Sequence, residues 1–235
     1  MPTSGFLLVD KPAGITSHDV IDRLRRITGE RRIGHAGTLD PFATGLLIVA
    51  VGREATKEIS KYVGMDKTYE AELVLGATTE TLDPEGEVIV DSTTPRLLDS
   101  TTITAAMQSL TGDILQIPPM YSAIKKNGKK MYELARQGKT IELEPRPVTI
   151  FEFELMNGFT GQPHGVAPTA INVRIRCSSG TYVRALARDL AGLLGTIGYV
   201  RQLRRTTIGP STIEQATALG DINTNNWQTL VKKEV

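Results

Sequence analysis

One carboxylate, Asp40, lies in the middle of a loop whose composition favours a rigid backbone. Gly34, Gly37 and Gly45 allow unusual dihedral angles or the close approach of another chain segment. Pro41 follows Asp40 and restricts its backbone to an extended conformation. A carboxylate presented in this way suits nucleophilic or acid–base catalysis.

A second group of polar residues precedes a predicted helix. Residues 178–184 (SSGTYVR) lead from a strand into this helix, so Tyr182 and Arg184 lie near its first turn. From that position a side chain can meet a carboxylate that is held elsewhere on a sheet. The apolar face of the helix is expected to contain Leu186, Leu190, Leu193 and Leu194.

Basic residues gather on three segments. Residues 23–32 contain five arginines, which a solvated helix face explains most simply and a phosphate-binding rim explains as an alternative. Residues 121–150 hold seven basic and three acidic residues, interleaved with Tyr121 and Tyr132. That mixture suits phosphates and unstacked bases, but a solvated hairpin or lid explains it equally well. Residues 198–205 (GYVRQLRR) are the third segment, and together the three suggest chemistry on a nucleic acid.

The composition limits the other kinds of chemistry. There are 27 basic and 26 acidic residues, so a polyanion must be met by a local patch. The three histidines are far apart, and the single cysteine, Cys177, excludes an internal disulfide and is best interpreted as a packing residue. The glycines around Asp40 have neither Walker A nor dinucleotide-site spacing. We therefore expect no metal and no cofactor.

Hydropathy gives no sign of a membrane. No stretch approaches the ~20 apolar residues that a membrane-spanning helix needs, and the first residues lack the features of a signal peptide. We expect a cytoplasmic protein without membrane contact.

The elements that must position these residues are predicted from their polarity. Apolar residues 46–51 follow the Asp40 loop and predict a buried strand. A capping box of Thr16 and Asp19 begins a helix, and Gly29 ends it. Further strands are expected at residues 5–10, 67–75, 87–90, 147–156 and 170–177, and further helices at residues 54–63 and 102–110. This irregular order favours an α+β fold with a mixed, mainly antiparallel sheet and flanking helices.

Several ordered motifs together resemble one known family. The main match is residues 34–47 (GHAGTLDPFATGLL), which is similar to the signature of the bacterial tRNA pseudouridine synthase B family. The other matches are residues 8–12, 16–17, 66–69, 117–123, 132–138, 179–184 and 203–205. The resemblance covers roughly residues 5–213 and implies a pseudouridine synthase fold.

The resemblance also implies a reaction and its catalytic residues. A member of this family would isomerise uridine to pseudouridine in the T-stem-loop of tRNA, at the position conventionally numbered 55, after flipping the base out of the stack and without a cofactor. Asp40 matches the catalytic aspartate and Arg184 the arginine that pairs with it, which would favour the charged carboxylate. Tyr69 matches the tyrosine that stacks on the target base and assists proton transfer.

Other family positions would contact the substrate. His35 matches the residue inserted into the RNA where the nucleotide has left, and Tyr182 and Leu203 match further contacts. Lys57 and Asp83 match polar positions near the site. Residues 113–147 correspond to an inserted basic extension that grips the RNA.

The expected organisation is a catalytic domain at residues 1–213 followed by a short tail at residues 214–235, which is too short for the complete C-terminal RNA-binding domain of many relatives. We expect a monomer that binds tRNA.

Two rival hypotheses for the function are a catalytically silent RNA-binding factor and a nucleotide-cofactor enzyme. The first gives no chemical reason to keep Asp40, Tyr69 and Arg184 together.

Overall fold

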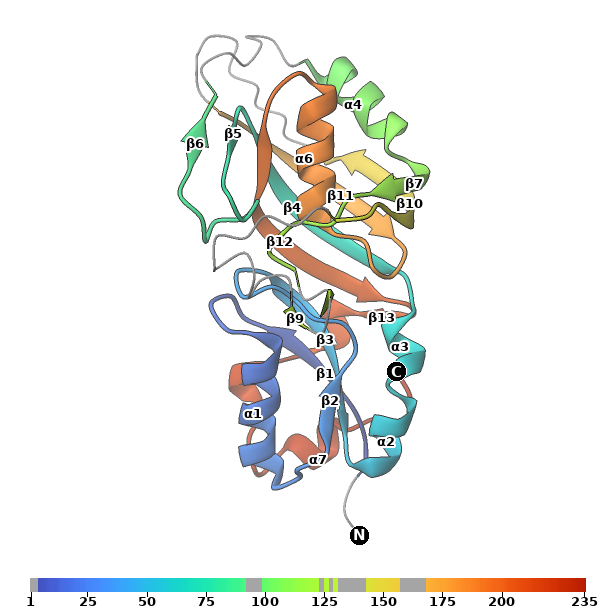
Figure 1. Ribbon diagram of the computed structural model, residues 1–235. Coiled ribbons are helices and arrows are strands. Elements are labelled where there is room, and N and C mark those ends of the chain that lie inside the picture. Colours follow the sequence, from blue (N-terminus) through green and yellow to red (C-terminus); the bar gives the residue numbers. More distant parts are fainter. Residues whose placement is uncertain (1–3, 92–98, 123–124, 127–128, 131–142, 157–167) are drawn as a thin grey trace. The chain divides into compact units, whose positions relative to one another are not determined.

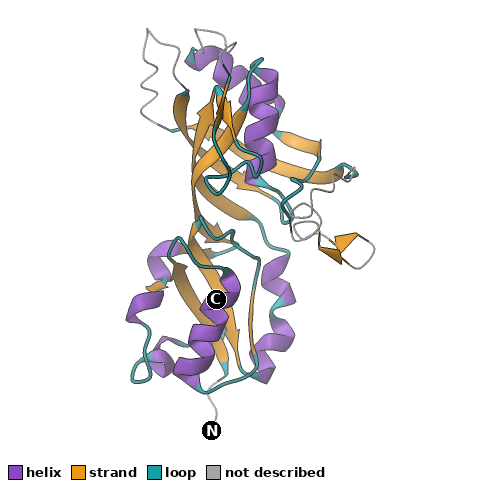
Figure 2. Ribbon diagram, turned by 60° about the vertical axis from the view of Figure 1, so that its left-hand side comes forward, coloured by secondary structure: helices purple, strands orange, loops and turns teal. Residues whose placement is uncertain are grey.

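The computed structural model describes residues 4–91, 99–122, 125–126, 129–130, 143–156 and 168–235. The chain divides into two compact units, which we call unit 1 (Met1–Glu70 with Leu203–Val235) and unit 2 (Ala71–Gln202). Strands β4 (Lys67–Leu75) and β12 (Gly198–Ile208) contribute residues to both units. Figures 1 and 2 show helices beside strands in each unit, as an α+β fold requires.

Unit 1 is built on an antiparallel pair of strands. Strand β1 (Gly5–Lys11) pairs with β3 (Thr44–Val51) along its whole length, from Gly5 opposite Val51 to Lys11 opposite Gly45. Strand β2 (Ile33–His35) is antiparallel to the far end of β3, and β12 is parallel to its beginning. Strand β13 (Ser211–Thr212) pairs with β12, and β14 (Thr217–Ala218) pairs with β1.

Helix α1 (Ser17–Thr28) has the ends that the sequence predicts. The Thr16 side chain accepts a hydrogen bond from the backbone N–H of Asp19, whose carboxylate accepts from the backbone N–H of Thr16. Gly29 ends the helix in the left-handed region, at φ 71°. The expected helix at residues 54–63 is divided into α2 (Arg53–Glu58) and α3 (Ser60–Val63). Ile59 separates them with helical dihedral angles, so the expected helix is interrupted rather than absent.

The core of unit 1 covers both faces of the β1–β3 pair. Successive side chains of a strand point to opposite faces, so a strand covered on both sides is apolar at every position. One face packs against α1 and the C-terminal segment, and the other packs against α2 and α3. The first core contains Leu7, Val9, Leu47, Val49, Val20, Leu24, Leu219, Ile222 and Trp227. The second contains Phe6, Leu8, Leu46, Ile48, Ala50, Ala55 and Tyr62.

The segment expected to be a tail belongs to this core. It forms short 3₁₀ helices η1 (Ile213–Gln215) and η2 (Leu219–Asp221), strand β14 and helix α7 (Trp227–Leu230). The backbone of Lys232 exchanges two hydrogen bonds with Phe6, of 2.7 and 2.9 Å. Residues 214–235 therefore complete unit 1.

Unit 2 contains a sheet with the strand order β12–β4–β11–β10–β7. Strand β10 (Arg146–Leu155) is antiparallel to both β11 (Thr169–Cys177) and β7 (Gly112–Gln116). Helices α4 (Ser100–Ser109) and α6 (Val183–Leu193) belong to this unit. Two small hairpins are formed by β5 (Ala77–Thr78) with β6 (Ile89–Val90) and by β8 (Lys125–Lys126) with β9 (Lys129–Lys130).

Two expectations for unit 2 are wrong in detail. The strand predicted at residues 87–90 is limited to Ile89 and Val90, which are more than half exposed. Leu193 was expected on the apolar face of α6, but its side chain is 57% exposed. Leu190 and Leu194 are buried, so the buried face of the helix includes them and leaves out Leu193. Cys177 is buried at the end of β11, as its packing role requires. None of the helices in the described ranges has the length and hydropathy for a membrane crossing.

Candidate active site

The Asp40 loop, residues 36–43, connects β2 to β3 in unit 1. Its backbone is attached at both ends, because Ala36 N–H donates to Ile48 O at 2.9 Å and Gly14 N–H donates to Pro41 O at 2.9 Å. A further bond of 3.1 Å from Ala43 N–H to Asp40 O closes a turn around the aspartate. The rigid presentation of Asp40 that the sequence predicts is therefore supported by backbone geometry.

A buried lysine holds the end of this loop. The ammonium group of Lys11, on β1, donates to the carbonyl oxygens of Pro12, Ile15 and Pro41 at 2.9, 2.7 and 3.2 Å. Burial lowers the pKa of Lys11 from 10.5 to about 8, while the negative charge of Asp40 opposes that shift. Lys11 thus adds a positive charge close to Asp40.

A buried serine holds the middle of the loop. The hydroxyl of Ser17 donates to Leu39 O at 3.1 Å and accepts from Leu39 N–H at 2.9 Å. Both polar backbone groups of the residue before Asp40 are thereby satisfied by one side chain, and Ser17 is only 1% exposed.

A buried arginine holds the beginning of the loop. Arg205, on β12, is 1% exposed and donates from Nε to Leu46 O at 2.8 Å and from Nη2 to Gly37 O at 3.0 Å. The expectation of a basic surface at residues 198–205 is therefore wrong for Arg205. Arg201 and Arg204 are partly exposed, and they form ion pairs with Glu72 and Asp10, respectively.

Three further predicted site residues belong to unit 1. Tyr69 on β4 and Leu203 on β12 are each 8% exposed, and β4 and β12 are neighbours in the sheet. His35, at the end of β2, has a lowered pKa because of burial and the nearby positive charge of Arg205. A neutral imidazole is therefore expected at pH 7, and a contact of His35 with RNA stays a prediction.

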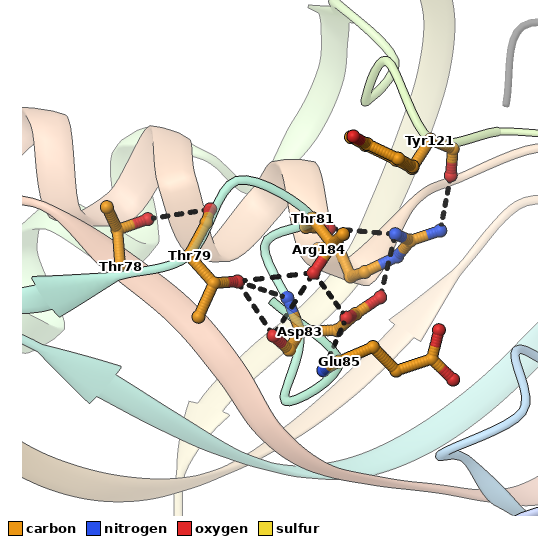
Figure 3. A network of polar contacts seen from close by, with 7 residues as sticks. All are labelled: Thr78, Thr79, Thr81, Asp83, Glu85, Tyr121 and Arg184. Atoms are coloured by element: carbon orange, nitrogen blue, oxygen red, sulfur yellow. Dashed lines mark hydrogen bonds and ion pairs between the residues drawn. The ribbon is translucent and has the colours of Figure 1, made fainter. Parts of the chain in front are cut away.

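Arg184, in unit 2, is the centre of a polar network (Figure 3). Its Nη1 donates to Asp83 Oδ2 at 2.9 Å and to Thr81 O at 2.8 Å, and its Nη2 donates to Tyr121 O at 2.8 Å. The side chains of Arg184 and Asp83 are 5% and 4% exposed. The pairing of Arg184 with Asp40 stays a prediction, because the two residues belong to different units.

The start of helix α6 is fixed by a side chain of β7. The buried amide of Gln116 accepts from Tyr182 N–H at 2.9 Å and donates to Tyr182 O at 3.2 Å. These bonds position the residue before the helix and hence the first turn that carries Arg184. Tyr182 itself is half-buried, and its contact with substrate stays a prediction.

Lys57 lies on the exposed face of α2 and pairs with Glu54 at 3.1 Å. This is a surface ion pair within one helix, and a contribution of Lys57 to the site stays a prediction.

Part of the basic extension is described: Tyr121 precedes the β8–β9 hairpin of lysines 125, 126, 129 and 130. Tyr132, Arg136 and Lys139 lie outside the described residues. Within the described ranges, no group of three or more histidine, cysteine, aspartate or glutamate side chains could hold a metal ion.

The sequence analysis missed three residues that hold the Asp40 loop, namely Lys11, Ser17 and Arg205. Arg205 could have been found from strand alternation, since it is two residues from Leu203 and shares its face. Ser17 follows the helix cap, a position where a buried polar residue suggests a backbone partner. Lys11 gave no signal beyond its place in a matched motif.

Chains in two solved complexes have a similar fold. A Cbf5-Nop10-Gar1 complex has a matching chain with a TM-score of 0.68 and 26% identity, over 92% of this chain and 53% of that one. An archaeal box H/ACA sRNP Nop10-Cbf5 complex has a chain with a TM-score of 0.68 and 22% identity, over 99% of this chain and 60% of that one. The fold is that of pseudouridine synthases.

Sequence comparisons define the class further. The sequence model of the family described as TruB family pseudouridylate synthase (N terminal domain) matches residues 25–183 of this chain. Proteins named tRNA pseudouridine synthase B are similar to this chain in Corynebacterium efficiens (46% identity, 94% of this chain and 73% of that one) and Thermobifida fusca (47%, 93% and 74%). The Mycobacterium tuberculosis H37Rv relative is 48% identical, over 93% of this chain and 71% of that one. These matches define a pseudouridine synthase, which is an isomerase. The chain belongs to the TruB family of pseudouridylate synthases.

Proposed function

We propose that this chain isomerises uridine to pseudouridine at position 55, in the T-stem-loop of tRNA. The proposal is carried by one observation: Asp40, the residue that matches the family's catalytic aspartate, lies in a loop held by Lys11, Ser17 and Arg205. Relatives that are 46–48% identical over more than 90% of this chain and are named tRNA pseudouridine synthase B support tRNA as the substrate.

The reaction rearranges bonds without adding atoms. The bond between N1 of uracil and C1′ of the ribose breaks, the uracil turns, and a bond forms between C5 and C1′. C5 loses a proton and N1 gains one, so the product is an isomer and no co-reactant is required. Asp40 starts this sequence as a nucleophile or as a base, and either role needs the ionised carboxylate. Lys11 favours that form through its nearby positive charge.

Tyr69 and Arg184 complete the proposed catalytic set. The ring of Tyr69 stacks on the uracil, and its hydroxyl can donate or accept the proton that moves. Arg184 pairs with the Asp40 carboxylate in the assembled site. Asp83 holds the Arg184 guanidinium in place through the buried ion pair. His35, Tyr182 and Leu203 contact the flipped nucleotide and its neighbours.

The target base has to leave the stack before it can react. Flipping costs a few kcal/mol, so RNA contacts elsewhere must offset that cost. We assign this role to the basic extension at residues 113–147, whose lysines and tyrosines suit phosphates and exposed bases. We expect the protein to act as a cytoplasmic monomer.

The test is to incubate the purified chain with an unmodified tRNA transcript and to map pseudouridine in the product. We expect modification of uridine 55 and none in a transcript with cytidine at that position. Binding of the transcript without any product would instead favour the silent RNA-binding factor. RNA affinity should fall as salt rises, because phosphate contacts release counterions. An affinity that does not depend on salt would contradict the role of the basic extension.

A further inference from the structure

Two buried side chains from distant parts of unit 1 meet the Asp40 loop on its backbone. Ser17 comes from the first turn of α1 and Arg205 from β12. Ser17 contacts both polar backbone groups of Leu39, one residue before Asp40, and Arg205 contacts the carbonyl of Gly37, three residues before it. The two residues thus fix the segment that leads into Asp40.

The position of Ser17 is itself fixed. The capping box of Thr16 and Asp19 determines where α1 begins, and Ser17 is its first helical residue. A hydroxyl group both donates and accepts, so one serine side chain can satisfy the N–H and the C=O of the same residue. Alanine at this position would leave the buried N–H and C=O of Leu39 without this partner, which is unfavourable for both groups.

The position of Arg205 is fixed by the pairing of β12 with β3. Arg205 lies opposite Gly45, and a Cβ atom on Gly45 would collide with the backbone of Arg205. The guanidinium then reaches Leu46 O and Gly37 O, one on each flank of the loop. Burying a cation among carbonyl groups contributes little to stability compared with well-packed apolar residues. A gain in stability is therefore a weak reason for Arg205, whereas control of the loop geometry is a specific one.

We propose that Ser17 and Arg205 are positioning residues for Asp40. This inference rests on the proposed function, in which Asp40 starts the reaction. Both side chains are 1% exposed, so neither can contact the RNA directly. They act on the reaction through the distance and direction from the Asp40 carboxylate to the ribose and the base. An error of about 1 Å in such a geometry can lower a rate by about a hundredfold.

The test uses Ser17→Ala, Arg205→Lys and Arg205→Met with Ser211→Ala as the matched control. Ser211 is also 1% exposed in unit 1, and its hydroxyl has no hydrogen-bond partner among the described residues. Single-turnover rates, KM and RNA affinity are measured on the tRNA transcript. Hydrogen exchange of the amides at residues 36–43 is measured in parallel, and it reports on the loop without any turnover.

We expect Ser17→Ala and Arg205→Met to lower kcat about tenfold to hundredfold, with KM and RNA affinity within about twofold of wild type. Arg205→Lys keeps the charge and one donor, so its kcat should lie between those of wild type and Arg205→Met. In the double variant Ser17→Ala/Arg205→Met the losses should not multiply, because both changes release the same loop. Hydrogen exchange of the amides at residues 36–43 should be faster than in wild type in Ser17→Ala and Arg205→Met. It should be unchanged in Ser211→Ala.

Unchanged kcat or unchanged loop exchange in folded Ser17→Ala and Arg205→Met would overturn the proposal. A loss confined to RNA affinity or KM would also overturn it. An inactive wild-type protein would instead refute the proposed function. In that case the exchange experiment would still decide whether these two side chains hold the loop.

Discussion

The guanidinium of Arg184 lies 2.9 Å from the carboxylate of Asp83, and neither side chain is more than 5% exposed. Asp83 is also fixed from its other oxygen, which accepts from the backbone N–H of Glu85 at 3.0 Å. The matched position for which the family gave only an uncertain role thus forms the buried partner of a proposed catalytic arginine.

Removal of one member of this pair should be strongly destabilising. We expect Asp83→Ala to lower the free energy of unfolding by about 3–5 kcal/mol, because the Arg184 charge stays buried without its carboxylate. The control is Glu152→Gln in the half-exposed pair of Glu152 with Arg176, which should cost about 0–1 kcal/mol. Urea unfolding measures both. A loss for Asp83→Ala no larger than that of the control would contradict the assigned importance of the pair.

Lys11 predicts a fall in activity at alkaline pH. Its ammonium group is protonated below its pKa of about 8, and the charges that act on it are those of Asp40, Arg205 and Asp19. Above that pH the positive charge beside Asp40 is lost, so the single-turnover rate should fall with an apparent pKa near 8. Lys11→Met should be slow at all pH values and lack this transition, whereas Lys61→Met on the exposed α3 should keep it. A wild-type rate that stays constant through pH 9 would contradict the role of Lys11.

Stability should change with pH in the opposite direction. The pKa of Lys11 is lower in the folded state than its ordinary value of 10.5, so the unfolded chain binds more protons at this site between pH 8 and 10.5. The contribution of Lys11 to the free energy of unfolding therefore rises in that window, by at most about 1.4 kcal/mol per pH unit. The difference in unfolding free energy between wild type and Lys11→Met, measured from pH 7 to 10, should show this rise. A difference that is independent of pH would be inconsistent with the lowered pKa.

Gly45 should not tolerate a side chain. Its φ of 105° is unfavourable for other residues, and an added Cβ atom would collide with the backbone of Arg205. We expect Gly45→Ala to cost about 1–3 kcal/mol beyond the dihedral strain itself, together with a loss of activity. Gly29→Ala is the control, because Gly29 also has a positive φ but open space around it. Equal losses of stability in the two variants would show that the contact with Arg205 is not tight.

The C-terminal segment should be necessary for the stability of unit 1. Trp227 is 7% exposed and packs in the same core as Leu7, Val49 and Leu24. We expect Trp227→Ala to lower the free energy of unfolding by about 3–5 kcal/mol. Leu193→Ala, at a 57% exposed position, should change it by less than about 0.5 kcal/mol. A small effect of Trp227→Ala would mean that residues 214–235 contribute little to the stability of unit 1.

The local parts of the fold could be predicted from the sequence because local signals determine them. The capping box at Thr16 and the glycine at residue 29 gave both ends of α1, and polarity gave β3 and β4. The family motifs then gave the pseudouridine synthase fold. The packing of Trp227 could not be predicted, since it depends on which distant residues cover the β1–β3 pair.

The site was predictable only where residues matched a motif. Asp40 and its rigid loop followed from Gly37, Pro41 and Gly45, but the side chains that hold the loop did not. Arg205 was interpreted as a surface charge because it lies in a run of basic residues. Strand alternation with Leu203 could have predicted its burial, but its contact with the Asp40 loop depends on the parallel pairing of β12 with β3, a long-range contact that no local pattern encodes.

The central claim is that Asp40 starts the isomerisation of uridine, and Asp40→Asn tests it most directly. Asparagine keeps the shape of the side chain but cannot act as a nucleophile or base. The measurement is the yield of pseudouridine at position 55 of a tRNA transcript under single-turnover conditions, with RNA affinity determined on the same sample. We predict no detectable product with an affinity within about twofold of wild type. A near-normal rate in Asp40→Asn would contradict the account.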